Sequence, residues 1–351
     1  MSNFLFTLSL GLALLPLLLW AYIVLPRERW QIIAAIPTRK GTTNGYWHGT
    51  NITYYGALLA SGSLFGVMAF FLLLAAMGMP LWGIIGLVLG VMGCSVAAAK
   101  LLAMAVEKKR NTFTVGGAAI IGLLSMPPAV AAYNGLAWRW DAPQVSLIPV
   151  MAALAVAYLL GEGIGRLACL SFGCCYGKPL SELGPKTRRF FAPLAVTFHG
   201  STKKISYASG LAGVAVVPIQ AITSFLSVNI GLVAMYFFLE GGVRTAFLLA
   251  ALFALGWRIV SEYFRADYRG EGKFSAYQQM ALLGMGYCTL LALYGGNGVA
   301  SQTDLGAGLA LLWNPIALLF FQALWLLLFI YTGFSTVTGA MLVFHVHEKK
   351  I

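Results

Sequence analysis

The chain contains 351 residues, of which 60% are hydrophobic and 10% are charged, and its formal net charge is +12. Because soluble globular domains usually have about 25% charged residues, this composition excludes an ordinary soluble protein. It predicts an all-α polytopic membrane protein. We expect the membrane surface, and not a nucleic acid, to account for the excess of basic residues.

Nine apolar segments are long enough to cross a hydrocarbon core about 30 Å thick, which takes roughly 20 apolar residues per helix. Their approximate bounds are 3–25, 52–77, 80–105, 113–134, 145–172, 213–239, 245–264, 276–294 and 312–335. The first segment has no basic region before it and is too long for the core of a signal peptide. We therefore expect it to be a retained transmembrane helix.

The basic residues are distributed unequally between the two membrane faces. If the nine segments alternate in direction, one face receives 18 Lys and Arg residues, and the other receives Arg139 and Arg244. The basic face comprises loops 26–51, 107–112, 173–212 and 265–275 and the C-terminus. Such an imbalance favours a cytoplasmic position for this face. An alternative is that the face binds anionic lipid head groups.

The longest connection between the segments, 173–212, carries six basic residues against Glu182 and contains three prolines. Long connections of this kind are commonly lids or binding elements. We expect a small hairpin over 190–205. A solvated basic loop is the alternative.

Three cationic residues, Lys100, Arg166 and Arg258, lie inside or at the ends of apolar segments. Ionisable residues at this depth are costly and mark functional sites. Arg258 and Glu262 are four residues apart, which places them on one helix face, about 5–6 Å apart at their Cβ atoms. We expect a functional site there, and a mutually neutralising structural pair is the alternative.

Three of the five cysteines, Cys169, Cys174 and Cys175, lie together at the end of the fifth segment. Cys94 and Cys288 lie in apolar runs and are predicted to be packing residues. The spacing does not indicate a disulfide framework. A zinc site is only a weak alternative, because no second cysteine pair or nearby histidine completes four ligands, and we predict no metal and no cofactor. A thiol near Arg166 is expected to have a lowered pKa and to act as a nucleophile or proton acceptor. Buried, inert cysteines are the alternative.

The segment 165–177, Gly-Arg-Leu-Ala-Cys-Leu-Ser-Phe-Gly-Cys-Cys-Tyr-Gly, resembles the signature of the bacterial prolipoprotein diacylglyceryl transferase family, Gly-Arg-x-Gly-Asn-x-x-Asn-Gly-Glu-x-x-Gly. Some wider members share the Gly-Cys-Cys-Tyr-Gly ending. Residues 257–267 resemble the family's Arg-x-x-x-Glu-Phe-x-Arg-x-x-Asp segment, and 275–278 resemble its Ser-x-Gly-Gln.

Weaker matches follow the same order along the chain. Residues 52–56 resemble the family's Trp-Tyr-Gly, and Lys100 stands where an arginine is common. Residues 115–117 resemble its His-Gly-Gly, and 217–220 resemble its His-Pro-x-Gln. The ordered series spans about residues 50–294 and is more specific than any single match.

The resemblance implies a seven-helix core in which phosphatidylglycerol donates its diacylglyceryl group to a cysteine thiol and glycerol phosphate is released. The core would be 52–294, with 173–212 as its basic lid or head loop. Residues 1–51 would add a helix and a basic loop, and 295–351 a helix and a tail. The expected location is the bacterial cytoplasmic (inner) membrane.

The resemblance also assigns roles to individual residues. Arg166 and Arg258 would bind the phosphodiester, and Glu262 would orient Arg258 or a head-group hydroxyl. Guanidinium groups suit this role because they bind phosphate oxygens bidentately. Further substrate-binding residues would be Tyr55, Lys100, Gly116, Gly117, Cys169, Gly173, Gln220, Arg265 and Gln278.

The chain departs from the family at the groups that would activate the acceptor. Val115 and Val217 stand in place of both family histidines, and valine cannot transfer a proton. Cys169 and Cys174 stand in place of the signature asparagine and glutamate. We therefore predict that Cys174 or Cys175 supplies the missing step for an unidentified acceptor. The loop histidines His48 and His199 are further candidates, although solvated roles suit them better.

Two functions of different classes follow from the sequence. The first is a transferase that moves a diacylglyceryl or related group from an anionic phospholipid. The second is a non-enzymatic protein that binds or moves lipids on the same fold. In the resembling family the signature face opens outside the cytoplasm, whereas the basic loops of this chain favour a cytoplasmic opening.

Overall fold

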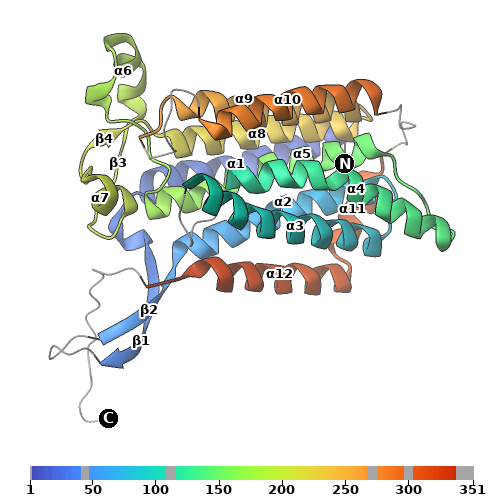
Figure 1. Ribbon diagram of the computed structural model, residues 1–351, viewed down its shortest axis with the longest axis horizontal. Helices are drawn as coiled ribbons and strands as arrows, with labels where there is room; N and C mark the ends of the chain where they lie inside the picture. Colours follow the sequence, from blue (N-terminus) through green and yellow to red (C-terminus); the bar gives the residue numbers. More distant parts are fainter. Residues whose placement is uncertain (1, 41–46, 108–114, 267–274, 296–302, 337–351) are drawn as a thin grey trace.

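The computed structural model describes residues 2–40, 47–107, 115–266, 275–295 and 303–336 (Figure 1). Each of the nine predicted segments coincides with a long helix in this part of the chain. The helices are α1 (Asn3–Val24), α2 (Tyr54–Ala76), α3 (Leu81–Glu107), α4 (Val115–Arg139), α5 (Leu147–Phe172), α8 (Ile219–Leu239), α9 (Val243–Glu262), α10 (Ala276–Tyr294) and α12 (Pro315–Gly333). Within the described residues, seven helices are long and apolar enough to cross a membrane. The predicted all-α, multi-pass membrane fold is thus confirmed.

Helix α5 is the centre of the bundle and contacts α2, α4, α8 and α9. It lies closest to α2, where glycines face each other: a Cβ on Gly62 would lie 2.4 Å from the backbone nitrogen of Gly165. A Cβ on Gly66 would lie 2.7 Å from the Ala157 carbonyl oxygen. Small residues commonly allow transmembrane helices to approach this closely. The contact fixes the part of α5 that carries the ionisable residues.

The first and last long helices flank this bundle. Helix α1 packs against α8, and α12 packs against α2. The short helix α11 (Leu305–Leu312), which precedes α12, also contacts α2. Helices α1 and α12 therefore cover different sides of the central helices.

A small sheet occupies one end of the bundle, where the sequence predicted only a basic loop (Figure 1). Strands β1 (Ile32–Lys40) and β2 (Trp47–Thr53) pair antiparallel, and β5 (Phe334–Ser335), which follows α12, pairs with β2. The strand segments are rich in isoleucine and threonine, which favour extended backbone. Because β5 joins β2, the chain leaves α12 at the same end of the bundle as this sheet.

The connection 173–212 and the residues just after it form a compact head at that same end (Figure 1). Its elements are η2 (Leu180–Glu182), α6 (Pro185–Phe191), η3 (Ala192–Leu194), β3 (Val196–Thr197), α7 (Lys204–Ser209) and β4 (Ala215–Val216). Strand β3 pairs antiparallel with β4. The predicted hairpin over 190–205 is wrong in its bounds, because α7 lies between the paired strands. Phe198 and Ile205 are fully buried and give the head an apolar core.

Lys203 connects the head to the helix ends below it. Its side chain is fully buried, contrary to the solvated basic loop that the sequence left open as an alternative. The Nζ atom donates hydrogen bonds to the Leu25 carbonyl oxygen, at 3.0 Å, and to the Ser171 carbonyl oxygen. Carbonyls at helix ends lack donors within their own helix, so the lysine satisfies groups that would otherwise be unpaired. It thereby ties together the ends of α1 and α5.

The burial of Lys203 predicts a pH-dependent stability. Burial lowers the pKa of this lysine from 10.5 to about 7, against a smaller opposing effect of Glu28. Between about pH 7 and pH 10.5, Lys203 is mostly neutral in the folded protein and mostly protonated in the unfolded chain, so unfolding takes up a proton. The contribution of Lys203 to stability is therefore smallest below about pH 7 and increases with pH up to about 10.5. We expect the thermal denaturation midpoint of Lys203→Met in detergent to rise less between about pH 7 and pH 9 than that of the unmodified protein.

The variant Lys204→Met is the matched control, because Lys204 is the adjacent lysine and is only half-buried. It should keep the pH dependence of the unmodified protein. Equal slopes for Lys203→Met and the unmodified protein would contradict the assignment.

Candidate functional site

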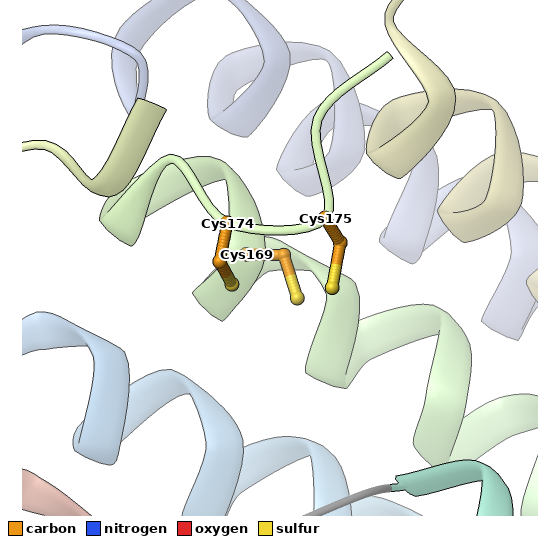
Figure 2. Close-up of side chains that lie close together, drawn as sticks. All are labelled: Cys169, Cys174 and Cys175. Atoms are coloured by element: carbon orange, nitrogen blue, oxygen red, sulfur yellow. The ribbon is translucent and has the colours of Figure 1, made fainter. Parts of the chain in front are cut away.

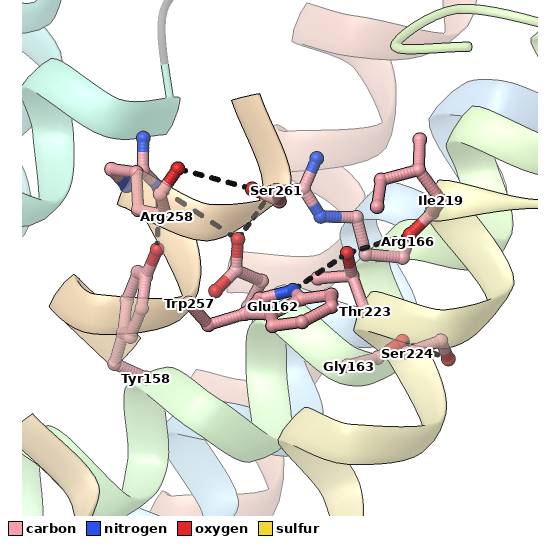
Figure 3. Close-up of polar contacts among 10 residues, drawn as sticks. All are labelled: Tyr158, Glu162, Gly163, Arg166, Ile219, Thr223, Ser224, Trp257, Arg258 and Ser261. Carbon is pink, nitrogen blue, oxygen red and sulfur yellow. Dashed lines mark hydrogen bonds and ion pairs between the residues drawn. The ribbon is translucent and has the colours of Figure 1, made fainter. Parts of the chain in front are cut away.

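Glu162 joins two arginines from different helices within the membrane-spanning bundle (Figure 3). Its Oε1 atom accepts a hydrogen bond from Nη2 of Arg166, one turn further along α5, and lies 3.7 Å from Nη2 of Arg258 on α9. Arg258 also donates a hydrogen bond of 2.9 Å to the hydroxyl of Tyr158. The side chains of all three charged residues are largely buried. Two guanidinium groups are therefore held at one carboxylate.

This arrangement corrects the predicted partner of Arg258. The ion pairs found among the described residues join Arg258 and Arg166 to Glu162, and none joins Arg258 to Glu262. Glu262, at the last turn of α9, instead accepts a hydrogen bond from the Ser275 hydroxyl, just before α10. Glu162 and Arg166 have the same four-residue spacing as Arg258 and Glu262, so the sequence carried a signal for this ion pair as well.

Helix α8 fixes the positions of the two arginine-bearing helices (Figure 3). The Trp257 Nε1 atom on α9 donates a hydrogen bond of 2.9 Å to the Thr223 hydroxyl. The neighbouring Ser224 hydroxyl donates one of 2.6 Å to the Gly163 carbonyl on α5. Gly163 and Trp257 directly follow and precede Glu162 and Arg258 in the sequence. The two hydrogen bonds therefore limit how far α5 and α9 can move apart at these charged residues.

The cluster of Glu162, Arg166 and Arg258 has an excess positive charge and an unused donor. One carboxylate and two guanidinium groups sum to +1. The Nε atom of Arg166 is buried and has no hydrogen-bond partner among the described residues. A buried charge without full compensation is costly, and Arg166 can donate one more hydrogen bond. Both features suit an anionic ligand.

The three clustered cysteines meet in space at the end of α5 (Figure 2). Their Sγ atoms all lie within 4.8 Å of one another, and none forms a disulfide. Cys169 and Cys175 are also electrostatic neighbours of Arg166. Cys169 belongs to the last turn of α5, and Cys174 and Cys175 belong to the loop that follows it. Gly173 turns the chain there with a φ of 70°, and Cys175 has a φ of 55°. The loop therefore folds back over the helix end that carries Cys169.

Cys174 is buried, and its thiol differs from the prediction. Hydrogen bonds with Cys169 and Cys175, together with burial, raise the pKa of Cys174 well above its usual value. The expected lowering of its pKa by Arg166 is therefore wrong for this residue. Gln220 holds this loop from α8, since its Nε2 atom donates a hydrogen bond of 2.9 Å to the Cys174 carbonyl.

Tyr55, at the start of α2, borders both the thiols and a cavity. Its electrostatic neighbours include Arg166 and all three cysteines. Its ring meets Phe172 edge to face, with centroids 5.4 Å apart. The cavity of about 180 Å³ lies between the small sheet and the ends of α2, α5 and α12. Its lining is Gln31, Ile32, Asn51, Thr53, Tyr55, Phe172, Thr332, Phe334 and Ser335.

The two strongest sequence motifs lie side by side at this end of the bundle. The Lys178 amide donates a hydrogen bond of 2.8 Å to the Phe264 carbonyl, and the Ala266 amide donates one of 3.1 Å to the Tyr176 carbonyl. Gly177 and Arg265 form an isolated β-bridge between these contacts. The loop after α5 and the end of α9 are thus paired through their backbones.

Several other predicted residues have defined positions. Gln278 forms a capping box with Ser275 at the start of α10, and its Nε2 atom donates to the Ile259 carbonyl. This gives Gln278 a structural role, while its role in substrate binding stays a prediction. Val217, in place of a family histidine, is fully buried beside Gly177, so this position supplies no proton-transfer group.

The remaining predictions concern less central positions. Lys100, Gly116 and Gly117 lie in α3 and α4 where the structure describes the backbone but not the side chains. His48 and His199 are exposed, in β2 and in the head. Cys288 is buried, as expected of a packing residue, whereas Cys94 is exposed.

Comparison with known proteins agrees with this order of motifs. The sequence model of a family described as prolipoprotein diacylglyceryl transferase matches residues 46–294. The chain is also similar to the phosphatidylglycerol–prolipoprotein diacylglyceryl transferase of Clostridium tetani (strain Massachusetts / E88). The two are 26% identical over 247 residues, which cover 64% of this chain and 84% of the relative.

Proposed function

The chain belongs to the prolipoprotein diacylglyceryl transferase family, a family of membrane transferases, and from this premise we propose that it transfers a diacylglyceryl group from an anionic phospholipid. The donor would be phosphatidylglycerol or a close relative, as the name of the clostridial protein states for that protein. The acceptor of this chain is not identified. We place the reaction in the bacterial cytoplasmic membrane.

The observation that carries this proposal is the pair of guanidinium groups held at Glu162. A phosphodiester carries one negative charge, which would balance the net charge of +1 on the cluster. Its oxygens could accept hydrogen bonds from the unpartnered Nε of Arg166 and from the guanidinium fork of Arg258. Glu162 would keep two like charges close together before the lipid arrives.

The chemistry follows from this binding mode. A nucleophilic atom of the acceptor would form a bond to the terminal carbon of the diacylglyceryl group, while the bond from that carbon to the phosphate oxygen breaks. Glycerol phosphate would leave with the bonding electrons, and the acceptor would lose a proton. Preorganised guanidinium groups stabilise such a leaving group because its negative charge increases in the transition state.

The alternative function is a protein that binds or moves lipids without chemistry. The observation in its favour is Val217, a buried apolar side chain where the family has a histidine. Mass spectrometry of membrane lipids with and without the gene separates the two functions. A lipid species that appears or disappears supports the transferase, whereas a changed leaflet distribution alone supports the alternative.

The variant Arg258→Lys tests the role of the guanidinium fork. Lysine keeps the charge but not the planar pair of donors, and an ionic hydrogen bond contributes about 1.5–3 kcal/mol. We expect formation of the lipid product to fall about ten- to a hundredfold, with little change in the amount of folded protein.

Arg244→Lys, at the other end of α9, is the matched control and should retain activity. If Arg258→Lys loses folded protein and activity in equal proportion, Arg258 is a structural ion-pair partner and its proposed role is wrong.

A second prediction concerns orientation. The small sheet and the head lie at one end of the bundle, and β5 brings the chain to that end after α12. This end carries most of the basic loops, so we propose that it faces the cytoplasm. An exported prolipoprotein would then be excluded as the acceptor, which would be a cytosolic or inner-leaflet molecule.

A reporter fused after Ile351 tests this orientation. We expect fluorescence from a protein that matures only in the cytoplasm, and no activity from a fused alkaline phosphatase. Alkaline phosphatase activity without fluorescence would show that the opposite orientation is correct.

A further inference from the structure

We propose that Cys169, Cys174 and Cys175 bind one divalent thiophilic cation, such as Zn²⁺, through their Sγ atoms and leave its fourth coordination position open. This differs from the sequence-based expectation of no metal, which rested on the lack of a fourth ligand. Three protein ligands with one open position are the usual composition of a catalytic zinc site.

The geometry of the thiols carries the proposal. Zinc–sulfur bonds of about 2.3 Å in a tetrahedral site place sulfur atoms about 3.8 Å apart. The three Sγ atoms already lie within 4.8 Å of one another, so small rotations of the side chains would complete the site. The backbone supports this arrangement, because the loop returns over α5 at Gly173 and Gln220 holds the Cys174 carbonyl.

The ligand type and the charge select the cation. Thiolates favour soft or borderline ions such as zinc and disfavour magnesium and calcium. Three thiolates around a divalent ion carry a net charge of −1, and the cluster of Glu162, Arg166 and Arg258 carries +1. Arg166 is an electrostatic neighbour of Cys169 and Cys175, so the two clusters adjoin. In the lipid-free protein these two charges would neutralise each other, which a monovalent ion would not achieve.

Metal binding would be balanced by proton release. Three S–H bonds would lose their protons to solvent as three metal–sulfur bonds form, so the affinity should increase with pH. The open position would then suit a thiol of the acceptor, because a metal ion deprotonates a thiol that it coordinates. This last step rests on the proposed function, and it would supply the acceptor activation that Val217 cannot.

The test is a titration of the reduced, purified full-length protein in detergent with Cd²⁺, a zinc analogue whose thiolate complexes absorb in the ultraviolet. We expect one Cd²⁺ per chain, an ultraviolet charge-transfer band, and displacement by Zn²⁺. Cys174→Ser should weaken binding at least about tenfold, the loss that even indirect disturbance of a metal site commonly causes. Cys169→Ala provides a second variant if Cys174→Ser does not fold.

Cys288→Ser is the matched control, since Cys288 is a buried cysteine of α10 outside the cluster, and it should bind like the unmodified protein. Absence of the band in folded, reduced protein would overturn the proposal, as would equal affinity in Cys174→Ser. Binding of phosphatidylglycerol vesicles is measured separately on the same samples. In the unmodified protein, absence of Cd²⁺ binding with retained lipid binding would refute the metal site alone, and Cd²⁺ binding without lipid binding would refute the proposed lipid site.

Discussion

The sharing of Glu162 by Arg166 and Arg258 is the interaction on which the proposed lipid site depends. Two like charges within a membrane-spanning bundle repel each other and are costly to bury, and one carboxylate between them reduces both effects. It does not remove them, because the cluster retains a charge of +1 and an unpartnered Nε atom on Arg166. The same incomplete compensation that is unfavourable for stability makes the cluster suitable for an anionic lipid head group.

The rest of the fold determines where this cluster lies. Close glycine contacts between α2 and α5 fix the helix that carries Glu162 and Arg166. Hydrogen bonds from α8 hold α5 and α9 on either side of it. At the end of α5, Lys203 and the head secure the turn that brings the three thiols together. The thiols and the charged cluster are therefore parts of one region and are not independent features.

The sequence predicted some of these features well because they depend on local composition. Nine apolar segments were enough to locate nine long helices. The three cysteines were expected to lie together because they are close in the sequence. The ion pair of Arg258 and Glu262, which the sequence left open as an alternative, does not form in the part of the chain that the structure describes. Helical spacing shows which residues share a face, but not which residues another helix brings to that face. The raised pKa of Cys174 depends on hydrogen bonds with the other two thiols. Those bonds form because the turn at Gly173 folds the loop back over Cys169. The burial of Lys203 depends similarly on carbonyl groups from two distant helix ends.

We propose that Arg166 and Arg258 bind one lipid phosphate together. The most direct measurement is an experimental structure of the protein in nanodiscs that contain phosphatidylglycerol. A head-group phosphate is expected within hydrogen-bonding distance of both guanidinium groups, with the Nε of Arg166 as one of its donors. A structure in which both arginines contact only Glu162 and Tyr158, while the lipid phosphate lies elsewhere, would contradict it.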